Sequence, residues 1–380
     1  MEAEMVGERL ARLARALGTR ATRRGVVQTA AGLVALSSGG LVPRVAGQEA
    51  TPGGAAACPP GSAAENAALV ERYWAEVWTA GGEAVAVDLL AADELHHWGV
   101  GGDTVGPEAF AERLGRFLAA FPDFAIRIDQ LVAEGDLVAS RWTATATHEG
   151  EWLDIAPTGN HVEYTGVNLF RIACGRIAEA WGEADHLGLL RQIGGLPELA
   201  TPDATAAAAA VVASPAVPSA APPAASPAVC PAGGLGENRA VARRWFADAV
   251  NPRDLALLDE IVAPGAVLHA TGFPDAAGPA AMAELFRTLF AGFHDLQFAV
   301  DAGPAEGDLV VERWTATGTS DGAFQNLPPT GDVLSWTGIN VYRIACGQIA
   351  EVWTEADMLG RLRQLGTLPD VAVPAATPGA

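Results

Sequence analysis

The chain has 380 residues, a formal net charge of −21 and a sequence pI near 4.6. This length is more than one core usually needs, so two domains are expected. A strongly negative surface repels phosphate groups, and we expect neither nucleic-acid binding nor attachment to anionic membranes.

Residues 1–47 have the layout of an export signal. A basic segment ends in Arg23 and Arg24, and an apolar run and small residues follow. This order is typical of a secretory signal, and paired arginines favour the twin-arginine route. The alternative is an amphipathic helix that leads into a disordered leader. We expect an exported protein (extracellular, periplasmic or in the cell envelope) with no stable membrane span after cleavage.

A flexible arm is expected over residues 48–64, and a folded domain follows over 65–197. The predicted elements are helices at 65–79 and 83–91, a strand at 94–98, a helix at 107–121, strands at 124–133, 136–148, 161–173 and 176–185, and a short closing helix. Helices gathered at one end of the sequence, with consecutive strands after them, predict an α+β domain with an antiparallel sheet.

The same domain occurs a second time, over residues 234–369. A shift of 172 positions aligns RIACGRIAEAWGEAD, which begins at Arg171, with RIACGQIAEVWTEAD, which begins at Arg343. Between the copies, residues 198–233 are rich in alanine and proline, which cannot form a core, and a linker is expected there. Residues 370–380 share this composition and are expected to form a disordered tail.

Each copy carries one early and one late cysteine, and the four are Cys58, Cys174, Cys230 and Cys346. In an exported protein this spacing indicates disulfides rather than a metal site. Four cysteines allow three pairings, and the duplication favours Cys58 with Cys174 and Cys230 with Cys346. The alternative is four free buried thiols in a cytosolic protein.

Carboxylates and an indole alternate along the last strand of each copy. Side chains two residues apart share a face of a strand. The residues on that face are Glu179, Trp181, Glu183 and Asp185 in copy one and Glu351, Trp353, Glu355 and Asp357 in copy two. Asp185 and Asp357 are either helix N-caps or proton-transfer groups in an apolar cavity, where desolvation would raise the pKa of the carboxyl.

Histidines give further candidates. His97 and His269 end the first strand of their copies and are pocket or surface residues. His148 ends the apolar row of the strand at 136–148, where it is either structural or a group for acid–base chemistry, and Ser320 takes its place in copy two. Phosphate-binding, dinucleotide-binding and zinc motifs do not occur, so any chemistry is expected to need no metal or cofactor.

The order and spacing of these segments resemble the SnoaL-like polyketide cyclases, and most closely the ester cyclases. The matching segments include ENAALVERYWAEVW, EGDLVASRWTATATHEGEW and the closing hairpin. The resemblance implies the cone of the nuclear transport factor 2-like superfamily, with three helices over a strongly curved antiparallel sheet and a pocket inside. It also implies intramolecular aldol condensation of a polyketide ester without metal or cofactor, with Asp185 and Asp357 as general acid/base.

In this reading His97 and His148, with His269 in copy two, polarise or anchor carbonyl groups. The candidate pocket residues are Trp74, Trp142, Trp181 and Asn168 in copy one and Phe246, Trp314, Trp353 and Asn340 in copy two. We therefore predict that each copy binds a small apolar carbonyl compound, with cyclisation in copy one. The alternatives are a non-catalytic carrier or sensor, and a module for dimerisation, either as a homodimer or as a pseudo-dimer of the two copies.

Overall fold

The computed structural model describes residue 58 and residues 61–98, 102–195, 233–325 and 327–367. The expected export signal and tail, and almost all of the expected linker, lie outside these ranges. Residues 60–380 form one compact unit that contains both copies, named repeat 1 and repeat 2 below. Among the described helices, none is long and apolar enough to cross a membrane.

Repeat 1 begins with helices whose ends follow from the sequence. They are α2 (Ala63–Arg72), η1 (Tyr73–Thr79), α3 (Glu83–Leu89), α4 (Gly106–Ala120) and, after the sheet, α5 (His186–Gln192). Ser62 and Glu65 form a capping box, which satisfies two backbone amides at the start of α2. Pro107 lies in the first turn of α4, where its missing amide costs nothing.

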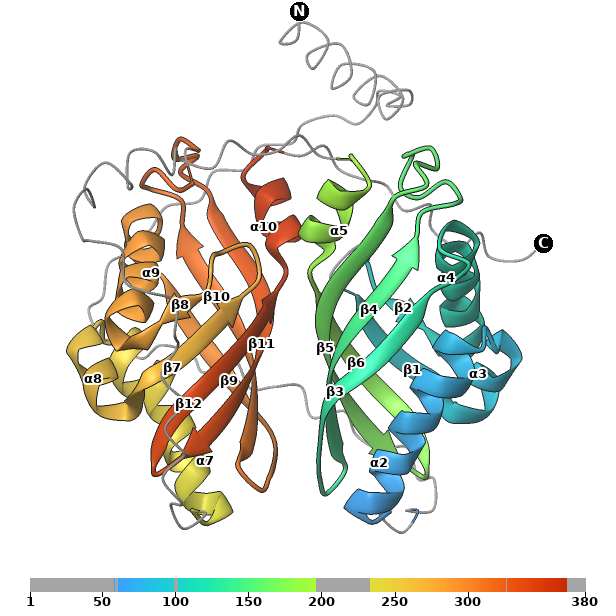
Figure 1. The fold of residues 1–380 in the computed structure, drawn as a ribbon, viewed down its shortest axis with the longest axis horizontal. Coiled ribbons are helices and arrows are strands. Elements are labelled where there is room, and N and C mark those ends of the chain that lie inside the picture. The colour runs from blue at the N-terminus through green and yellow to red at the C-terminus, as the bar shows by residue number, and fades with distance from the viewer. Residues whose placement is uncertain (1–57, 59–60, 99–101, 196–232, 326, 368–380) are drawn as a thin grey trace, which may run out of the picture. The chain divides into compact units, whose positions relative to one another are not determined.

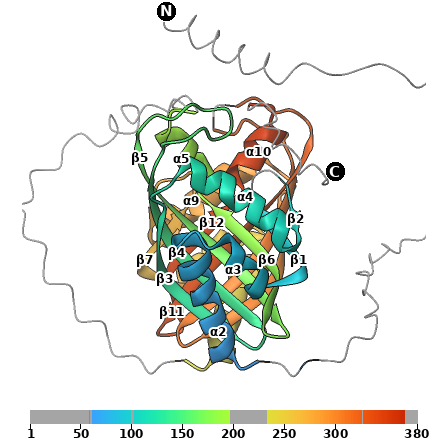
Figure 2. The ribbon, with the colours of Figure 1, turned by 90° about the vertical axis from the view of Figure 1, so that its right-hand side faces the viewer.

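Six strands form the sheet of repeat 1. They are β1 (Leu90–Trp98), β2 (Thr104–Val105), β3 (Ala125–Glu134), β4 (Leu137–Thr147), β5 (His161–Ala173) and β6 (Arg176–Ala184). The order is β2-β1-β6-β5-β4-β3, and α2, α3 and α4 lie along one side of this sheet (Figures 1 and 2). The predicted α+β cone is confirmed. The sheet is mixed rather than wholly antiparallel, because β1 and β6 pair in parallel.

Repeat 2 has the same order of elements. They are α7 (Leu235–Arg244), η2 (Trp245–Val250), η3 (Leu255–Leu257), α8 (Leu258–Ile261), β7 (Val262–Ala270), β8 (Ala276–Ala277), α9 (Gly278–Gly292), β9 (Gln297–Glu306), β10 (Leu309–Thr319), β11 (Val333–Ala345), β12 (Gln348–Ala356) and α10 (Met358–Gln364). Its strand order, β8-β7-β12-β11-β10-β9, repeats that of the first sheet. The duplication read from the sequence is therefore a duplication of the whole fold.

The last hairpin of each repeat turns on a Cys-Gly pair. In repeat 1, Cys174 and Gly175 have φ angles of 55° and 70°, the left-handed values that a two-residue type I′ turn requires. Cys346 occupies the same position in repeat 2, with φ 55°. Cys58, Cys174 and Cys346 are disulfide-bonded. Cys230 lies outside the described residues, and the predicted pairing stays a prediction.

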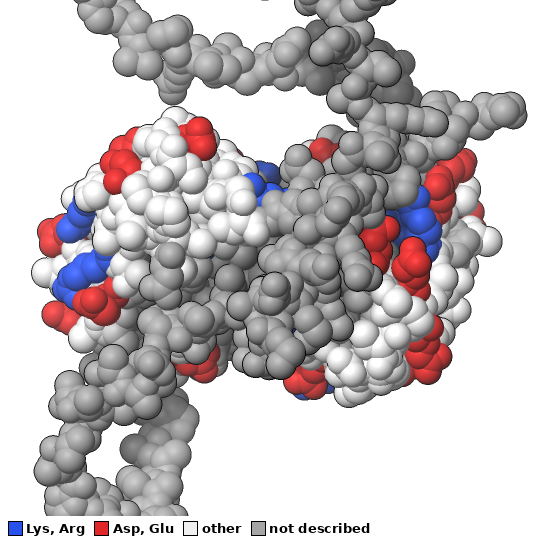
Figure 3. Space-filling model, turned by 90° about the horizontal axis from the view of Figure 1, so that it is seen from above, with Lys and Arg blue, Asp and Glu red and all other residues white. Residues whose placement is uncertain are grey.

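The outer faces of the two sheets contact each other. Val132, Val167 and Leu169 of repeat 1 form a buried apolar cluster with Val311, Ile339 and Val341 of repeat 2. Each sheet therefore has two covered faces: its own helices pack on one, and the other repeat packs on the second. On the face of the molecule shown in Figure 3, acidic side chains recur around the described rim, with basic ones interspersed among them.

Candidate functional site

Repeat 1 encloses a cavity of about 70 Å³ between its helices and the concave face of its sheet. We name it cavity 1. Its apolar wall is rich in aromatic side chains, namely Trp74, Trp78, Trp98, Phe117, Phe124, Trp142, Trp152 and Tyr164. The polar groups that line it are few: His96, Arg113, Asn168, Glu183 and His186. A largely apolar hollow with a small number of convergent polar groups is the usual form of a small-molecule site.

His96 lies in the wall of cavity 1 and forms a pair with Glu94. Both residues are on β1, two positions apart, so they share the inner face of the strand. The His96 Nδ1 lies 3.2 Å from Glu94 Oε1, and both side chains are almost completely buried. If Nδ1 donates to this carboxylate, Nε2 is left as the acceptor, and in the described residues this atom has no hydrogen-bond partner. Burial lowers the pKa of His96, and the carboxylate of Glu94 opposes that shift.

Arg113 brings a buried positive charge to the same wall from α4. Its guanidinium lies over the ring of Trp98, with Cζ 4.4 Å from the ring centroid, and Nη1 donates to the carbonyl of Gly102 at 3.3 Å. Burial lowers the pKa of Arg113 to about 10, so the group stays charged at neutral pH. Trp98 in turn stacks on His96, with centroids 4.0 Å apart. The imidazole and the guanidinium thus contact the same indole.

His186 adds a second imidazole at the start of α5. Burial lowers the pKa of His186 to about 4, and the positive charges of Arg113 and Arg363 act in the same direction. Both histidines of cavity 1 are therefore neutral near pH 7, and each is available as a hydrogen-bond acceptor or a base.

Trp142 and Asn168, two of the candidate pocket residues, line cavity 1. The Trp142 Nε1 donates to Asn168 Oδ1 at 2.8 Å, and Trp74 Nε1 donates to Ser140 Oγ at 3.0 Å. Gly166 lies under the indole, where an added Cβ would come within 2.1 Å of a ring carbon of Trp142. The glycine therefore makes room for this tryptophan.

Asp185 and Asp357 do not line either cavity. Asp185 is the N-cap of α5 and accepts from the amide of Gly188 at 2.7 Å; Asp357 caps α10 through Gly360 in the same way. Burial raises the pKa of both carboxyls, and the capping amides oppose it. Neither carboxyl lies in cavity 1 or in the corresponding cavity of repeat 2, cavity 2, which corrects the expectation of an aspartate inside these cavities. Both residues are helix caps, and Asp185 also borders an open groove between the repeats.

The face of β6 that carries Glu179, Trp181 and Glu183 points toward repeat 2, although Glu183, near the end of the strand, also borders cavity 1. The alternation was predicted correctly, but neither Trp181 nor Trp353 lines cavity 1 or cavity 2. Trp353 borders the open groove between the repeats. Arg313 of repeat 2 lies over Trp181 at 5.3 Å, and Arg141 of repeat 1 lies over Trp353 at 5.0 Å. The side chain of Glu183 accepts from Thr337 of repeat 2. This row is therefore a contact surface between the repeats, because the second sheet covers it.

His97 and His269 lie on the side of their sheets opposite to the cavities. His97 stacks on Trp181 and bridges Asp103 and Glu179 at 3.0 and 3.1 Å. His269 bridges Asp275 and Glu351 in the same manner. Neither histidine lines cavity 1 or cavity 2, and both are partly exposed members of ion-pair clusters. His269 borders the separate, open groove that Asp185 and Glu355 also line.

His148 is completely buried beside Phe121 and is not one of the residues that line cavity 1. Its Nδ1 lies 3.1 Å from Thr158 Oγ1, and its backbone amide continues the sheet by donating to Asn160. Ser320 takes this position in repeat 2 and accepts from the amide of Thr330 at 3.3 Å. Each side chain connects the end of its strand to the loop that carries Thr158 or Thr330. This is the structural role that was one of the two alternatives for His148.

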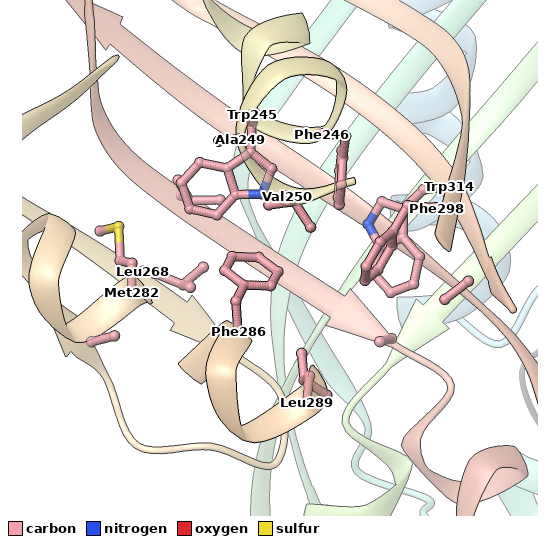
Figure 4. Close-up of a cluster of buried hydrophobic side chains, with 14 of the residues drawn as sticks. Trp245, Phe246, Ala249, Val250, Leu268, Met282, Phe286, Leu289, Phe298 and Trp314 are labelled. Atoms are coloured by element: carbon pink, nitrogen blue, oxygen red, sulfur yellow. The ribbon is translucent and has the colours of Figure 1, made fainter. Parts of the chain in front are cut away.

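Repeat 2 encloses a second hollow of about 60 Å³, named cavity 2. Three of the candidate pocket residues, Phe246, Trp314 and Asn340, line it. Figure 4 shows how Trp245 and Phe246 from η2 approach Phe286 and Leu289 from α9 around this interior. The positions of His96, Arg113 and His186 are taken by Leu268, Leu285 and Met358, which all line cavity 2. Its charged lining residue is Arg361 of α10.

Sequence reasoning missed the roles of Glu94, His96 and Arg113. The signal was present in β1, because Glu94, His96 and Trp98 alternate with His97 and so had to share the face opposite to it. Choosing His97 as the pocket residue placed the cavity on the wrong side of the strand. In the described residues, no group of three or more histidine, cysteine or acidic side chains is arranged to hold a metal ion.

Comparison with known proteins identifies the family. The family model for SnoaL-like polyketide cyclases matches residues 68–193 and again residues 240–365. These matches cover more than half of the chain, and the protein belongs to this family as a tandem pair of its domains. No curated protein matches the chain.

Several solved structures match a single repeat. AclR from Streptomyces galilaeus is 31% identical, over 36% of this chain and 100% of its own, with a TM-score of 0.33. IdmH from Streptomyces antibioticus is 30% identical, over 34% of this chain and 98% of its own, with a TM-score of 0.32. TsrD from Streptomyces laurentii is 28% identical, over 35% and 97%, with a TM-score of 0.33.

Proposed function

We propose that repeat 1 binds a small carbonyl compound in cavity 1 and transfers a proton on it, with His96 as the base. The observation that carries this proposal is the convergence of His96, Arg113 and His186 on one aromatic cavity. Aromatic walls favour a planar apolar ligand, and the few polar groups set its orientation.

The pair of Glu94 and His96 supports the role of base. A carboxylate that accepts from Nδ1 holds the imidazole in the tautomer whose Nε2 can take a proton, and it stabilises the imidazolium that forms. Burial keeps the imidazole neutral near pH 7. The proton removed would come from a carbon next to a carbonyl group, and the electron pair of the C–H bond would pass to the carbonyl oxygen as an enolate.

Arg113 supports the same step because its charge lies in the wall of the cavity. A positive group in a site of low polarity stabilises the negative charge that develops on an enolate oxygen. In an aldol-type closure the enolate carbon then bonds to a second carbonyl carbon of the same molecule. The new alkoxide takes the proton back from His96, so the reaction needs no oxidant and no metal.

The size of cavity 1 favours a second candidate, binding without turnover. At about 70 Å³ the cavity is small for a multi-ring polyketide, and a compact ligand held by the aromatic wall suits a carrier or sensor. The two candidates differ in whether His96 changes the ligand or only contacts it.

The test is proton exchange of acetylacetone in deuterated water, followed by NMR. We expect the protein to accelerate exchange of the central CH₂ group, and His96→Leu, which installs the residue of repeat 2, to slow it by about 100-fold or more. Asp185→Asn, which alters a helix cap outside cavity 1, is the matched control and should retain the rate. Binding detected by tryptophan fluorescence without faster exchange would favour the carrier. Loss of exchange in Asp185→Asn with retention in His96→Leu would contradict the proposal.

We also propose export by the twin-arginine route, supported by the sequence of residues 1–47 and by the disulfides at Cys58, Cys174 and Cys346. Disulfides persist in oxidising compartments. Replacing Arg23 and Arg24 by lysine should leave the protein in the cytoplasm, and mass spectrometry of the exported form should find a new N-terminus near residue 47. Unchanged export of the double variant would contradict this route.

A further inference from the structure

Arg361 is a buried cation in the wall of cavity 2. It comes from α10, and only 2% of the residue is exposed. Its guanidinium carbon lies 4.7 Å from the ring centroid of Phe324, 5.3 Å from that of Trp336 and 5.9 Å from that of Phe273. Three aromatic rings thus surround a group that usually requires a carboxylate when it is buried.

Two of the three guanidinium nitrogens of Arg361 make no hydrogen bond inside the described protein. Its Nε and Nη2 atoms are buried and have no hydrogen-bond partner there. The nearest acidic influence is Asp357, one helical turn earlier, and that carboxylate is engaged with the amide of Gly360 at 2.7 Å. A buried charge without hydrogen bonds is unfavourable, and contacts with aromatic faces offset this only in part.

Repeat 1 shows that the fold does not need this cation. The position equivalent to Arg361 is Leu189, an ordinary member of the apolar core of repeat 1. Leucine there packs well and carries no cost of desolvation, so stability alone favours leucine over arginine. An arginine in repeat 2 therefore indicates a requirement other than packing.

We propose that cavity 2 is a second ligand site, distinct from cavity 1, which binds a short-chain organic carboxylate. The two oxygens of the carboxylate would accept from Nε and Nη2 of Arg361, the two donors on one edge of the guanidinium, in the bidentate form that this group favours. The short apolar chain would lie against Phe246, Phe298 and Leu289, which line the same cavity. A volume of about 60 Å³ suits an acid of a few carbon atoms.

The chemistry of the two cavities then differs. Cavity 2 has Leu268 in place of His96, so it holds no equivalent base, and we assign it binding rather than turnover. Its occupant is an anion, whereas the occupant proposed for cavity 1 is neutral before it loses a proton. This inference concerns residues of repeat 2 alone, and exchange of acetylacetone by repeat 1 neither supports nor weakens it.

The test is calorimetric titration of the full chain with propionate and with propionamide, its neutral analogue of nearly the same shape. We expect saturable binding of propionate and at least tenfold weaker binding of propionamide. Arg361→Leu should weaken propionate binding at least tenfold while the protein keeps its circular dichroism spectrum and melts at the same or a higher temperature. Arg361→Lys should recover only part of the affinity, because lysine lacks the planar pair of donors.

Arg113→Leu is the matched control, since it removes the buried arginine of cavity 1 and installs the residue of repeat 2. It should leave the affinity for propionate unchanged. The proposal is overturned if propionate does not bind saturably, if propionamide binds as tightly, if Arg361→Leu binds propionate as the unaltered chain does, or if Arg113→Leu is the variant that loses binding.

Discussion

The two repeats share a scaffold and differ in what their cavities contain. Both have an indole that donates to an asparagine on the neighbouring strand, Trp142 to Asn168 and Trp314 to Asn340, at 2.8 and 2.9 Å. Several side chains that line the cavities differ. Repeat 1 holds His96, Arg113 and His186, whereas repeat 2 holds apolar residues at those positions and a single arginine elsewhere. The comparison teaches that one fold can keep its packing while its interior chemistry is exchanged.

Removing the shared indole should have the largest effect on stability. Trp142→Ala and Trp314→Ala each leave a void and an asparagine without its donor, and we expect the free energy of unfolding to fall by about 3–5 kcal/mol in each case. Urea unfolding monitored by circular dichroism measures it. Trp181→Ala, at the contact between the repeats, is the control and should cost less. If Trp142→Ala lowers the free energy of unfolding but Trp314→Ala does not, the interiors of the two repeats are not packed alike.

A smaller loss is expected when the glycine beneath each indole gains a methyl group. In Gly166→Ala and Gly338→Ala the new Cβ would lie within 2.1 and 2.2 Å of the rings of Trp142 and Trp314. Overpacking of this kind costs about 1–3 kcal/mol, measurable by the same unfolding experiment. As a control, Gly236→Ala in α7 meets nothing within 4 Å and should stabilise slightly. Equal stability of the four proteins would refute the close contact.

The contact between the repeats should weaken as pH rises. Burial raises the pKa of Glu183 to about 8 and that of Glu355 to about 7, in each case against the hydrogen bonds that their threonine partners donate. Groups that bind a proton more tightly in the folded protein stabilise it most below their unfolded pKa of about 4.5, and this stability is lost as pH rises through 7 and 8. Asp357, Arg313 and Glu355 are the charged groups that act on Glu183.

The measurement is the melting temperature from pH 5 to 9. Glu183→Gln and Glu355→Gln each keep a side chain that can form hydrogen bonds but that does not titrate. Each should reduce the fall in melting temperature between pH 5 and 9 by a few degrees. Glu163→Gln, on an exposed position of β5, is the control. If neither Glu183→Gln nor Glu355→Gln changes the decline of the melting temperature with pH, other titrating groups cause it.

The smallest effect is expected from the reciprocal contacts of arginine with tryptophan. Arg141→Ala and Arg313→Ala remove guanidinium groups that lie 5.0 and 5.3 Å from Trp353 and Trp181. Partly exposed contacts of this type contribute about 0.5–1 kcal/mol. Comparing the free energy of unfolding of the double variant with those of the single variants tests whether the two contacts are independent. A decrease as large as that of Trp142→Ala would mean that these contacts contribute more than expected.

Much of the fold could be predicted from the sequence. Apolar periodicity placed α4 and the long strands to within a few residues, and the shift of 172 positions carried every assignment from repeat 1 to repeat 2. The two-residue strand β2 was missed, because Thr104 and Val105 are too short a segment to show alternation. The parallel pairing of β1 with β6 was missed as well, since it joins segments separated by about 80 residues and depends on how the whole sheet closes.

The site was predictable only in part. Trp74, Trp142 and Asn168 line cavity 1 as expected, because they lie on elements whose apolar faces must point inward. Alternation along β6 showed that Trp181 and Asp185 share a face, but a period of two does not say which face is the concave one. Repeat 2 covers the outer, convex face of the sheet of repeat 1. The local sequence pattern of repeat 1 does not show which of its two faces this is.

The reciprocal hydrogen bonds between the repeats have an evolutionary consequence. Thr165 donates to Glu355 and Thr337 donates to Glu183, so the same pair of residues is used twice, once in each direction. In an assembly of two identical chains, any substitution would alter both interiors at once. When the two domains are in one chain, a substitution changes only one of them. Each cavity can then acquire its own specificity while the hydrogen bonds between the repeats are kept. Leu189 of repeat 1 and Arg361 of repeat 2 are an example of such a difference.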